Sequence, residues 1–388
     1  MEATDMDIEL NQQNTNITPN SMTSSKRFGL KNSIQTNFGD DYVFQIVHKE
    51  DWTSMAVSLS SNVVKLYSPV TGQYVGECGK HSDSINHILL SGSILYSGSN
   101  DGTLRAWDTR SYQQVACLNA GPSQQVFSFS FGGPGDNLLA AGCKSQILFW
   151  DWRSKNQVAC LEESHMDDVT QVQFVPEQNK LVSASMDGLI CTFDTSGEVN
   201  DDDHLESVIN VGTSIGKLGI FGKSHGKVWC LTHIETLSVW DIKDSNCEAN
   251  FEDARPLASN SWMQDHVDYF VDCHYSAVDD RLWVIGGTNA GSLGYFPVAH
   301  GGGMRSILSP EAVLHGGHTG VVRSVLPSAT MRSGMNQTQG IFGWTGGEDG
   351  RLCCWLSDSS SDINHSWIST SLVEKNPKSR KKNRHRPY

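Results

Sequence analysis

No run of about 18 apolar residues, the length that a membrane-spanning helix needs, occurs in the 388-residue chain. The first 35 residues also lack the apolar core of a signal peptide, and they are rich in Asn, Thr, Ser and Gln. Polar segments of this kind bury too little apolar surface to fold alone. We therefore expect no membrane contact and no secretion, and a disordered arm over residues 1–35.

Paired cysteines at the spacing of metal or redox sites are missing as well. The ten cysteines are scattered, and no Cys-x-x-Cys pair occurs among them. Several fall in apolar runs, where a free cysteine behaves as a small apolar side chain. The sequence thus predicts no metal, no cofactor and a reducing compartment inside the cell.

Long stretches with the 3.6-residue period of an amphipathic helix are also absent. The chain has short apolar runs instead, such as residues 171–175, 180–183 and 189–193, and Gly, Asp, Asn or Pro separates them. Short strands in unbroken succession indicate an antiparallel all-β domain rather than a parallel sheet with crossover helices.

A repeated ending suggests how this all-β domain is organised. Seven units each end on an aromatic residue, and four of them read Trp-Asp or Phe-Asp at that point. The seven aromatics are Tyr67, Trp107, Trp150, Phe193, Trp240, Phe296 and Trp355, and they lie 40, 43, 43, 47, 56 and 59 residues apart. A period of about 40 to 45 residues is that of a four-stranded propeller blade. The sequence therefore predicts a seven-bladed β-propeller over residues 36–373.

A propeller ring closes when one end of the chain supplies a strand to the blade built by the other end. Two segments qualify, residues 32–36 and residues 367–373, and the sequence does not choose between them. Closure removes exposed sheet edges, which would otherwise pair with other chains.

Three units share polar residues that resemble the WD40 repeat family. In that family a His, a Ser or Thr, an Asp and a Trp form one buried hydrogen-bonded tetrad, so the resemblance implies a structural role. The matching residues are His81, Ser99, Asp101 and Trp107 in the second unit, His165, Ser185 and Asp187 in the fourth, and His318, Asp349 and Trp355 in the last. Phe193 replaces the Trp in the fourth unit, and Gly347 stands at the Ser position in the last. An unpaired member would cost about 1 to 3 kcal/mol.

Other units depart from the pattern, since Lys144, Ile234 and Ala290 stand where the Asp is expected. A second resemblance covers the whole propeller. Residues 164–174, 284–289, 316–324 and 345–350, and the basic end of the chain, are similar to the family of WD repeat-containing protein 89. A resemblance of this kind supports a shared fold more strongly than a shared function.

Charge is unevenly divided along the chain. The net charge is −14, yet residues 375–388 contain no acid, which leaves −21 for the rest. The basic residues of this tail are Lys375, Lys378, Arg380, Lys381, Lys382, Arg384 and Arg386. An acidic body does not offer the clustered positive face that phosphates need. We expect a disordered tail over residues 374–388 that serves as a nuclear or nucleolar address, as a weak RNA contact, or only as a solvated end.

Two short sequence motifs resemble catalytic motifs, but each lacks the structural context that catalysis needs. Residues 212–216 fit the Gly-x-Ser-x-Gly pattern around Ser214, but that pattern requires a sharp strand-to-helix turn. Residues 222–224 resemble the end of a phosphate-binding loop, but Lys217 replaces its first Gly and no helix follows. We therefore expect turn glycines and no enzyme. A hydrolase would have to depend on Ser214.

Two consecutive units end in Trp-Asp-x-Arg. These endings resemble the box by which some WD40 proteins dock on the damaged-DNA-binding adaptor of cullin-RING ubiquitin ligases. The resemblance implies partner binding by Trp107, Asp108, Arg110, Trp150, Asp151 and Arg153. Two arginines at the ends of neighbouring strands would offer planar donors to a partner on one rim. The alternative is that each Arg pairs with acids of its own blade.

These observations predict a non-enzymatic scaffold that binds other proteins, most concretely a substrate receptor of a cullin-RING ubiquitin ligase. The alternative is a nucleolar scaffold in the assembly of the large ribosomal subunit. In that case the propeller gathers ribosomal and assembly proteins, and the tail adds a weak RNA contact. Both functions place the protein in the nucleus or nucleolus and in the cytoplasm.

Overall fold

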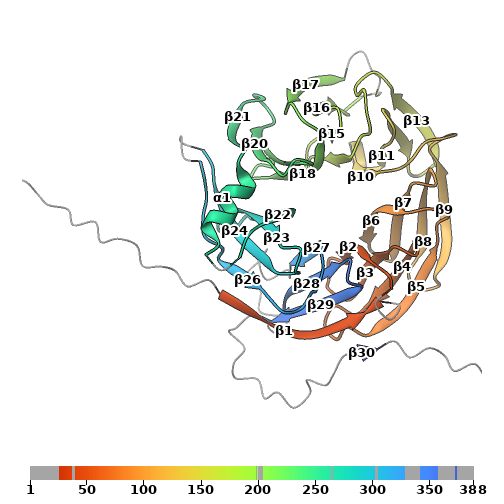
Figure 1. Ribbon diagram of the computed structural model, residues 1–388. Helices are drawn as coiled ribbons and strands as arrows, with labels where there is room; N and C mark the ends of the chain where they lie inside the picture. Colours follow the sequence, from red (N-terminus) through yellow and green to blue (C-terminus); the bar gives the residue numbers. More distant parts are fainter. Residues whose placement is uncertain are drawn as a thin grey trace, which may run out of the picture.

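The computed structural model describes residues 26–36, 40–197, 199, 204–263, 265–301, 305–327, 341–356 and 372–373. Within these residues, antiparallel sheets of four strands follow one another around a ring (Figure 1). Five blades are separate sheets, and the last two share one ten-stranded sheet. The predicted all-β, seven-bladed WD40 propeller is therefore confirmed.

The strands of each blade are consecutive in the sequence apart from the last. Blade 1 contains β2 (Val43–His48), β3 (Met55–Leu59), β4 (Val63–Tyr67) and β5 (Tyr74–Lys80). Blade 2 contains β6 (Ile85–Ser91), β7 (Ile94–Ser99), β8 (Thr103–Asp108) and β9 (Gln113–Asn119). Blade 3 contains β10 (Ser128–Gly132), β11 (Leu138–Gly142), β12 (Ile147–Asp151) and β13 (Asn156–Leu161). Blade 4 contains β14 (Gln171–Phe174), β15 (Lys180–Ala184), β16 (Leu189–Asp194) and β17 (Leu205–Asn210).

Blade 5 contains β18 (Ile215–Phe221), β19 (Lys227–Thr232), β20 (Leu237–Asp241) and β21 (Cys247–Phe251). Blade 6 contains β22 (Tyr269–Ser276), β23 (Arg281–Gly287), β24 (Leu293–Ala299) and β26 (Ala312–Leu314), and β25 (Ser306–Ile307) adds to β24. Blade 7 contains β27 (Val322–Pro327), β28 (Ile341–Gly347), β29 (Arg351–Leu356) and β1 (Lys26–Gln35). The short strand β30 (Leu372–Val373) pairs with β1 in parallel.

The ring is closed by the N-terminal segment. Strand β1 lies antiparallel to β29 as the outer strand of blade 7, so the first of the two predicted closing segments is the one used. The other end of β1 pairs in parallel with β26 and joins blades 6 and 7. The predicted disordered arm is therefore wrong from Lys26 onward, because pairing with β29 compensates for the polar composition of this segment. Residues 1–25 and the tail 374–388 lie outside the described residues.

The core lies between neighbouring blades. Strands β3 and β4 are buried along their whole length, because other blades cover both faces of the sheet. At the closure, Trp344 of blade 7 packs in one cluster with Tyr67 of blade 1, and its indole N–H donates to the Pro69 carbonyl at 2.8 Å. All ten cysteines are free and seven are buried, which confirms their use as small apolar side chains.

The connections contain the helical residues that the sequence does not predict. These are α1 (Ala254–Ser261), between blades 5 and 6, and the single turn η2 (Pro134–Asp136). Ala254 and Ala258 of α1 are buried, and together with the partly buried Leu257 they pack the helix against the core. Among the described residues, no helix has the length and apolar character to cross a membrane.

Candidate functional site

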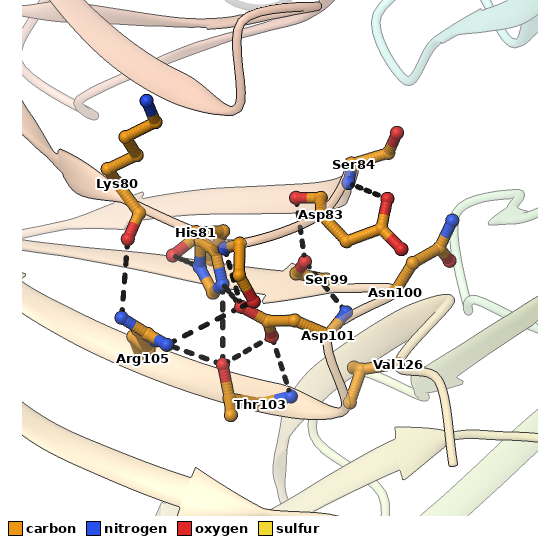
Figure 2. A network of polar contacts seen from close by, with 12 residues as sticks. Lys80, His81, Asp83, Ser84, Ser99, Asn100, Asp101, Thr103, Arg105 and Val126 are labelled. Carbon is orange, nitrogen blue, oxygen red and sulfur yellow. Dashed lines mark hydrogen bonds and ion pairs between the residues drawn. The ribbon is translucent and has the colours of Figure 1, made fainter. Parts of the chain in front are cut away.

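The tetrad of blade 2 connects the end of one blade to the turn of the next hairpin. His81 follows β5, and its Nδ1 lies 2.9 Å from Asp101 Oδ2 (Figure 2). Asp101 stands in the turn between β7 and β8, where its other oxygen accepts hydrogen bonds from the backbone N–H and hydroxyl of Thr103 at 3.0 and 2.6 Å. The carboxylate therefore fixes both the His81 loop and its own turn.

The hydroxyl of this tetrad belongs to Ser97 and not to the predicted Ser99. Ser97 Oγ lies 2.7 Å from His81 Nε2 and accepts the Trp107 indole N–H at 3.0 Å. Ser99 donates to the Asp83 carbonyl and accepts from the Asp101 amide instead. Residues two apart share one face of a strand, so the prediction had the correct face but the wrong step along β7.

The same correction holds in the other two tetrads. In blade 4, His165 contacts Asp187 at 3.0 Å and Ser183 at 2.7 Å, while Ser185 caps the turn. In blade 7, His318 contacts Asp349 at 3.0 Å and Thr345 at 2.7 Å, and Thr345 accepts the Trp355 indole at 2.8 Å. Thr345 lies two residues before Gly347, so the apparent loss of the hydroxyl in the last unit is wrong.

Burial and hydrogen bonding set the charges of the tetrads. Burial lowers the pKa of His81 and of His165, although Asp101 and Asp187 act in the opposite direction. Burial raises the pKa of Asp101, but the hydrogen bonds from Thr103, Ser82 and His81 outweigh it and hold that pKa well below its usual value. In the blade 2 tetrad, a neutral imidazole then donates to Asp101 and accepts from the Ser97 hydroxyl, which accepts from the Trp107 indole. In blade 7, burial lowers the pKa of His318, but its contacts with Asp349 and Cys353 outweigh burial and raise that pKa to about 9. Every polar group has a partner, and the set is structural.

The two Trp-Asp-x-Arg endings lie at the other ends of the same strands. Strand β8 runs from Thr103, close to Asp101, to Asp108. Because a strand rises about 3.3 Å per residue, the whole length of this strand separates the tetrad from the arginine. Strand β12 ends in the same way at Asp151 of blade 3. We call the end of the propeller that carries the tetrad histidines the tetrad face, and we call residues 107–110 and 150–153 the arginine rim.

The tryptophans of the arginine rim cannot contact a partner, contrary to the prediction. Trp107 and Trp150 are only 6% and 3% exposed, because both pack between blades. The Nε and Nη2 groups of Arg110 donate to the two carboxylate oxygens of Asp108 at 3.1 and 2.9 Å. These hydrogen bonds lower the pKa of Asp108 to about 2. The arginine thus pairs with its own blade, although its side chain is still 77% exposed.

Arg153 differs from Arg110. Its backbone N–H donates to Asp151 at 2.8 Å, but its exposed guanidinium forms no hydrogen bond or ion pair with any described residue. The neighbouring Trp152 packs edge-on against Tyr96 of blade 2, with 5.3 Å between ring centroids. Blades 2 and 3 are therefore locked together beside the free guanidinium.

The catalytic-looking strings do not form a recognisable active site. Ser214 Oγ lies 2.7 Å from His233 Nδ1, but β18 and not a helix follows Ser214. No hydrogen bond or ion pair joins His233 to a carboxylate of the described residues, so nothing orients the ring as a general base. Lys223 stands in the turn before β19, near Asp280. In the described part of the chain, no group of three or more His, Cys, Asp or Glu could hold a metal ion.

Comparison with known proteins agrees with this geometry. A family model described as WD domain, G-beta repeat matches residues 72–108 and 156–194, which contain the tetrad histidines of blades 2 and 4. The chain is 62% identical over the whole of both chains to the WD repeat-containing protein GTS1 of Arabidopsis thaliana. The chain belongs to the WD repeat family. A WD repeat-containing protein 89 homolog of Dictyostelium discoideum is 28% identical over 78% of this chain and 83% of its own length, which supports the second resemblance.

WD repeat proteins are generally scaffolds for other proteins and not enzymes. The general function of this WD repeat protein is therefore to bind other proteins. The tetrads give rigidity, and the exposed ends of the strands and turns are left for partners.

Proposed function

We propose that this WD repeat protein docks on the damaged-DNA-binding adaptor of a cullin-RING ubiquitin ligase and presents a client protein to the ligase. The observation that carries the proposal is the exposed, unpaired guanidinium of Arg153 on the same rim as Arg110. Both arginines follow the third strand of consecutive blades, so they project from neighbouring positions. Exposed arginines on a rigid rim are frequent hot spots of binding.

The pairing of Arg110 with Asp108 is compatible with docking. A guanidinium has five N–H donors, and the described contacts to Asp108 use only two of them. Asp108 also holds the planar group in one orientation, which reduces the entropy that binding would cost. In this proposal Arg110 is a pre-oriented donor, and Arg153 gains its first carboxylate or carbonyl partner in the complex.

Replacing both arginines should weaken adaptor binding strongly without changing the fold. We expect Arg110→Ala with Arg153→Ala to weaken binding to the purified adaptor by at least about thirtyfold, which corresponds to roughly 2 kcal/mol, measured by calorimetry. Lys243→Ala is the matched control, because Lys243 occupies the equivalent place after Trp240-Asp241 in blade 5. Unchanged adaptor affinity in the folded double variant would refute the proposal.

A second candidate function rests on the division of charge. A body with a charge of −21 attracts basic proteins, among which ribosomal proteins are prominent, and the seven basic residues of the tail suit RNA. In this alternative the protein is a nucleolar scaffold for assembly of the large ribosomal subunit, and its clients are ribosomal and assembly proteins.

The basic tail distinguishes the two functions. Deleting residues 375–388 should disperse a nucleolar signal in cells and reduce the amount of pre-ribosomal RNA that copurifies, because the deletion removes seven positive charges. A chain with the same tail residues in scrambled order is the control, and it should behave as wild type if charge alone acts. Normal localisation and normal RNA recovery after the deletion would eliminate the ribosomal role.

A further inference from the structure

Large apolar side chains are exposed to solvent on the tetrad face of blades 4 and 5. Met166 is 88% exposed and Ile234 65%, and Met186 is exposed to a lesser degree. Isolated exposed apolar residues are common, but a group of them on one face marks an interaction site. Ile234 occupies the turn position at which the tetrad blades carry Asp, so a solvated methyl-rich side chain has replaced a structural carboxylate.

Hydrogen bonds between the loops place these side chains on one continuous surface. The Met166 amide donates to Asp187, the residue after Met186, and the Met186 amide donates to the Asp168 carbonyl. These contacts put both methionines around the blade 4 tetrad.

The same surface continues into blades 5 and 6. Ser214 bonds to His233, the residue before Ile234, and Glu235 accepts the amide of Phe270 at 2.6 Å. Phe270 belongs to β22, the first strand of blade 6. The apolar residues therefore stand on loops that touch one another in order around the ring.

Carboxylates surround the apolar residues. They are Glu162, Glu163, Asp167 and Asp168 on the Met166 loop, Glu235 beside Ile234, and Asp265 and Asp268 before β22. Fewer bases lie near them among the described residues: His233, Arg255, whose Nη1 reaches the Asp268 carbonyl, His266, which pairs with Asp268, Lys144 near Asp168, and Arg323 near Glu235. Burial and the charge of Asp167 raise the pKa of Asp168, as expected where negative charges crowd.

We infer that this part of the tetrad face docks a segment of a partner protein that carries Lys or Arg beside apolar side chains. The carboxylates supply the charge complement, and the flexible methionines adapt to apolar side chains of different shapes. Nucleic acid is disfavoured, because its phosphates would meet a negative surface. The chain's own tail offers positive charge, but its only apolar side chains are those of two prolines and Tyr388, so it does not match the apolar part. This surface lies at the opposite end of the blades from the arginine rim, and the inference does not depend on adaptor binding.

Selection of peptides on the full-length chain tests the inference. A phage library of random dodecapeptides should yield peptides that combine basic and apolar side chains. Their affinity should fall at least about tenfold for Met166→Ala with Met186→Ala and Ile234→Ala. Val278→Ala is the control, because Val278 is 68% exposed in the turn between β22 and β23, away from the tetrad face. Selected peptides without basic residues, or equal binding to the triple variant, would overturn the inference.

A charge variant and two further chains complete the test. Asp167→Asn with Asp168→Asn should weaken the same peptides and reduce the salt dependence of their binding, whereas Asp244→Asn on the other face should not. The Arg110→Ala, Arg153→Ala chain should bind them normally, which separates this surface from the adaptor proposal. Binding that appears only after deletion of residues 375–388 would assign the surface to the tail, and preferential binding of single-stranded RNA would assign it to nucleic acid. Either result would overturn the inference.

Discussion

Deletion of residues 1–36 is expected to open the ring and to cost more than about 4 to 5 kcal/mol of unfolding free energy, a loss that only a major structural defect produces. Strand β1 pairs with β29 from Gly29 to Gln35, and the buried Ile34 packs with Trp344. Thr36 adds a backbone and a side-chain hydrogen bond to the Gly350 carbonyl, at 2.8 and 3.0 Å. Without these contacts, β29 becomes an additional strand whose outer edge is unpaired and exposed.

Thermal unfolding and size-exclusion chromatography measure this effect. The truncated chain should melt at a much lower temperature and elute as an aggregate, because an unpaired edge strand recruits other chains. Deletion of residues 1–25 is the matched control, since it leaves β1 whole. A truncated chain that stays monomeric and melts as wild type would show that residues 367–373 close the ring instead.

The choice between the two closing segments could not be made from the sequence. Both are short and mixed in character, and the pairing of Thr36 with Gly350 joins residues 314 positions apart. A local sequence pattern cannot predict which of two distant segments pairs with a strand. The aromatic ending of each unit is a local signal, and it predicted the blades correctly. Helix α1 escaped prediction for a related reason, because two buried alanines do not form a visible apolar stripe.

For the candidate site too, the sequence predicted the positions of residues along the strands but not their side-chain contacts or burial. Sequence spacing located the arginines at the ends of β8 and β12, but it could not show that Arg110 grips Asp108 while Arg153 has no such contact, since side-chain rotamers decide that. It also assigned Trp107 and Trp150 to a partner, although stacking of the blades buries both. The apolar group on the tetrad face left one signal in the sequence, namely Ile234 at a position where Asp is expected.

Replacing Ser97 by Ala should cost about 2 to 4 kcal/mol of unfolding free energy, more than replacing Ser99. The Ser97 hydroxyl links His81 Nε2 to the Trp107 indole, so its loss leaves two buried polar groups without a partner. Loss of the Ser99 hydroxyl frees the Asp83 carbonyl and the Asp101 amide beside the exposed turn, where water can replace it, and we expect about 1 kcal/mol.

Urea unfolding of the two alanine variants measures this difference, and Ser97→Thr supplies the control. Blade 7 carries Thr345 at the equivalent position, with the same contacts to a histidine and an indole at 2.7 and 2.8 Å. A threonine at position 97 should therefore retain most of the stability, although its extra methyl group must fit a fully buried site. If Ser99→Ala proved the more damaging change, Ser99 would be the true member of the tetrad. The hydrogen-bond chain from Trp107 through Ser97 and His81 to Asp101 would then be wrong.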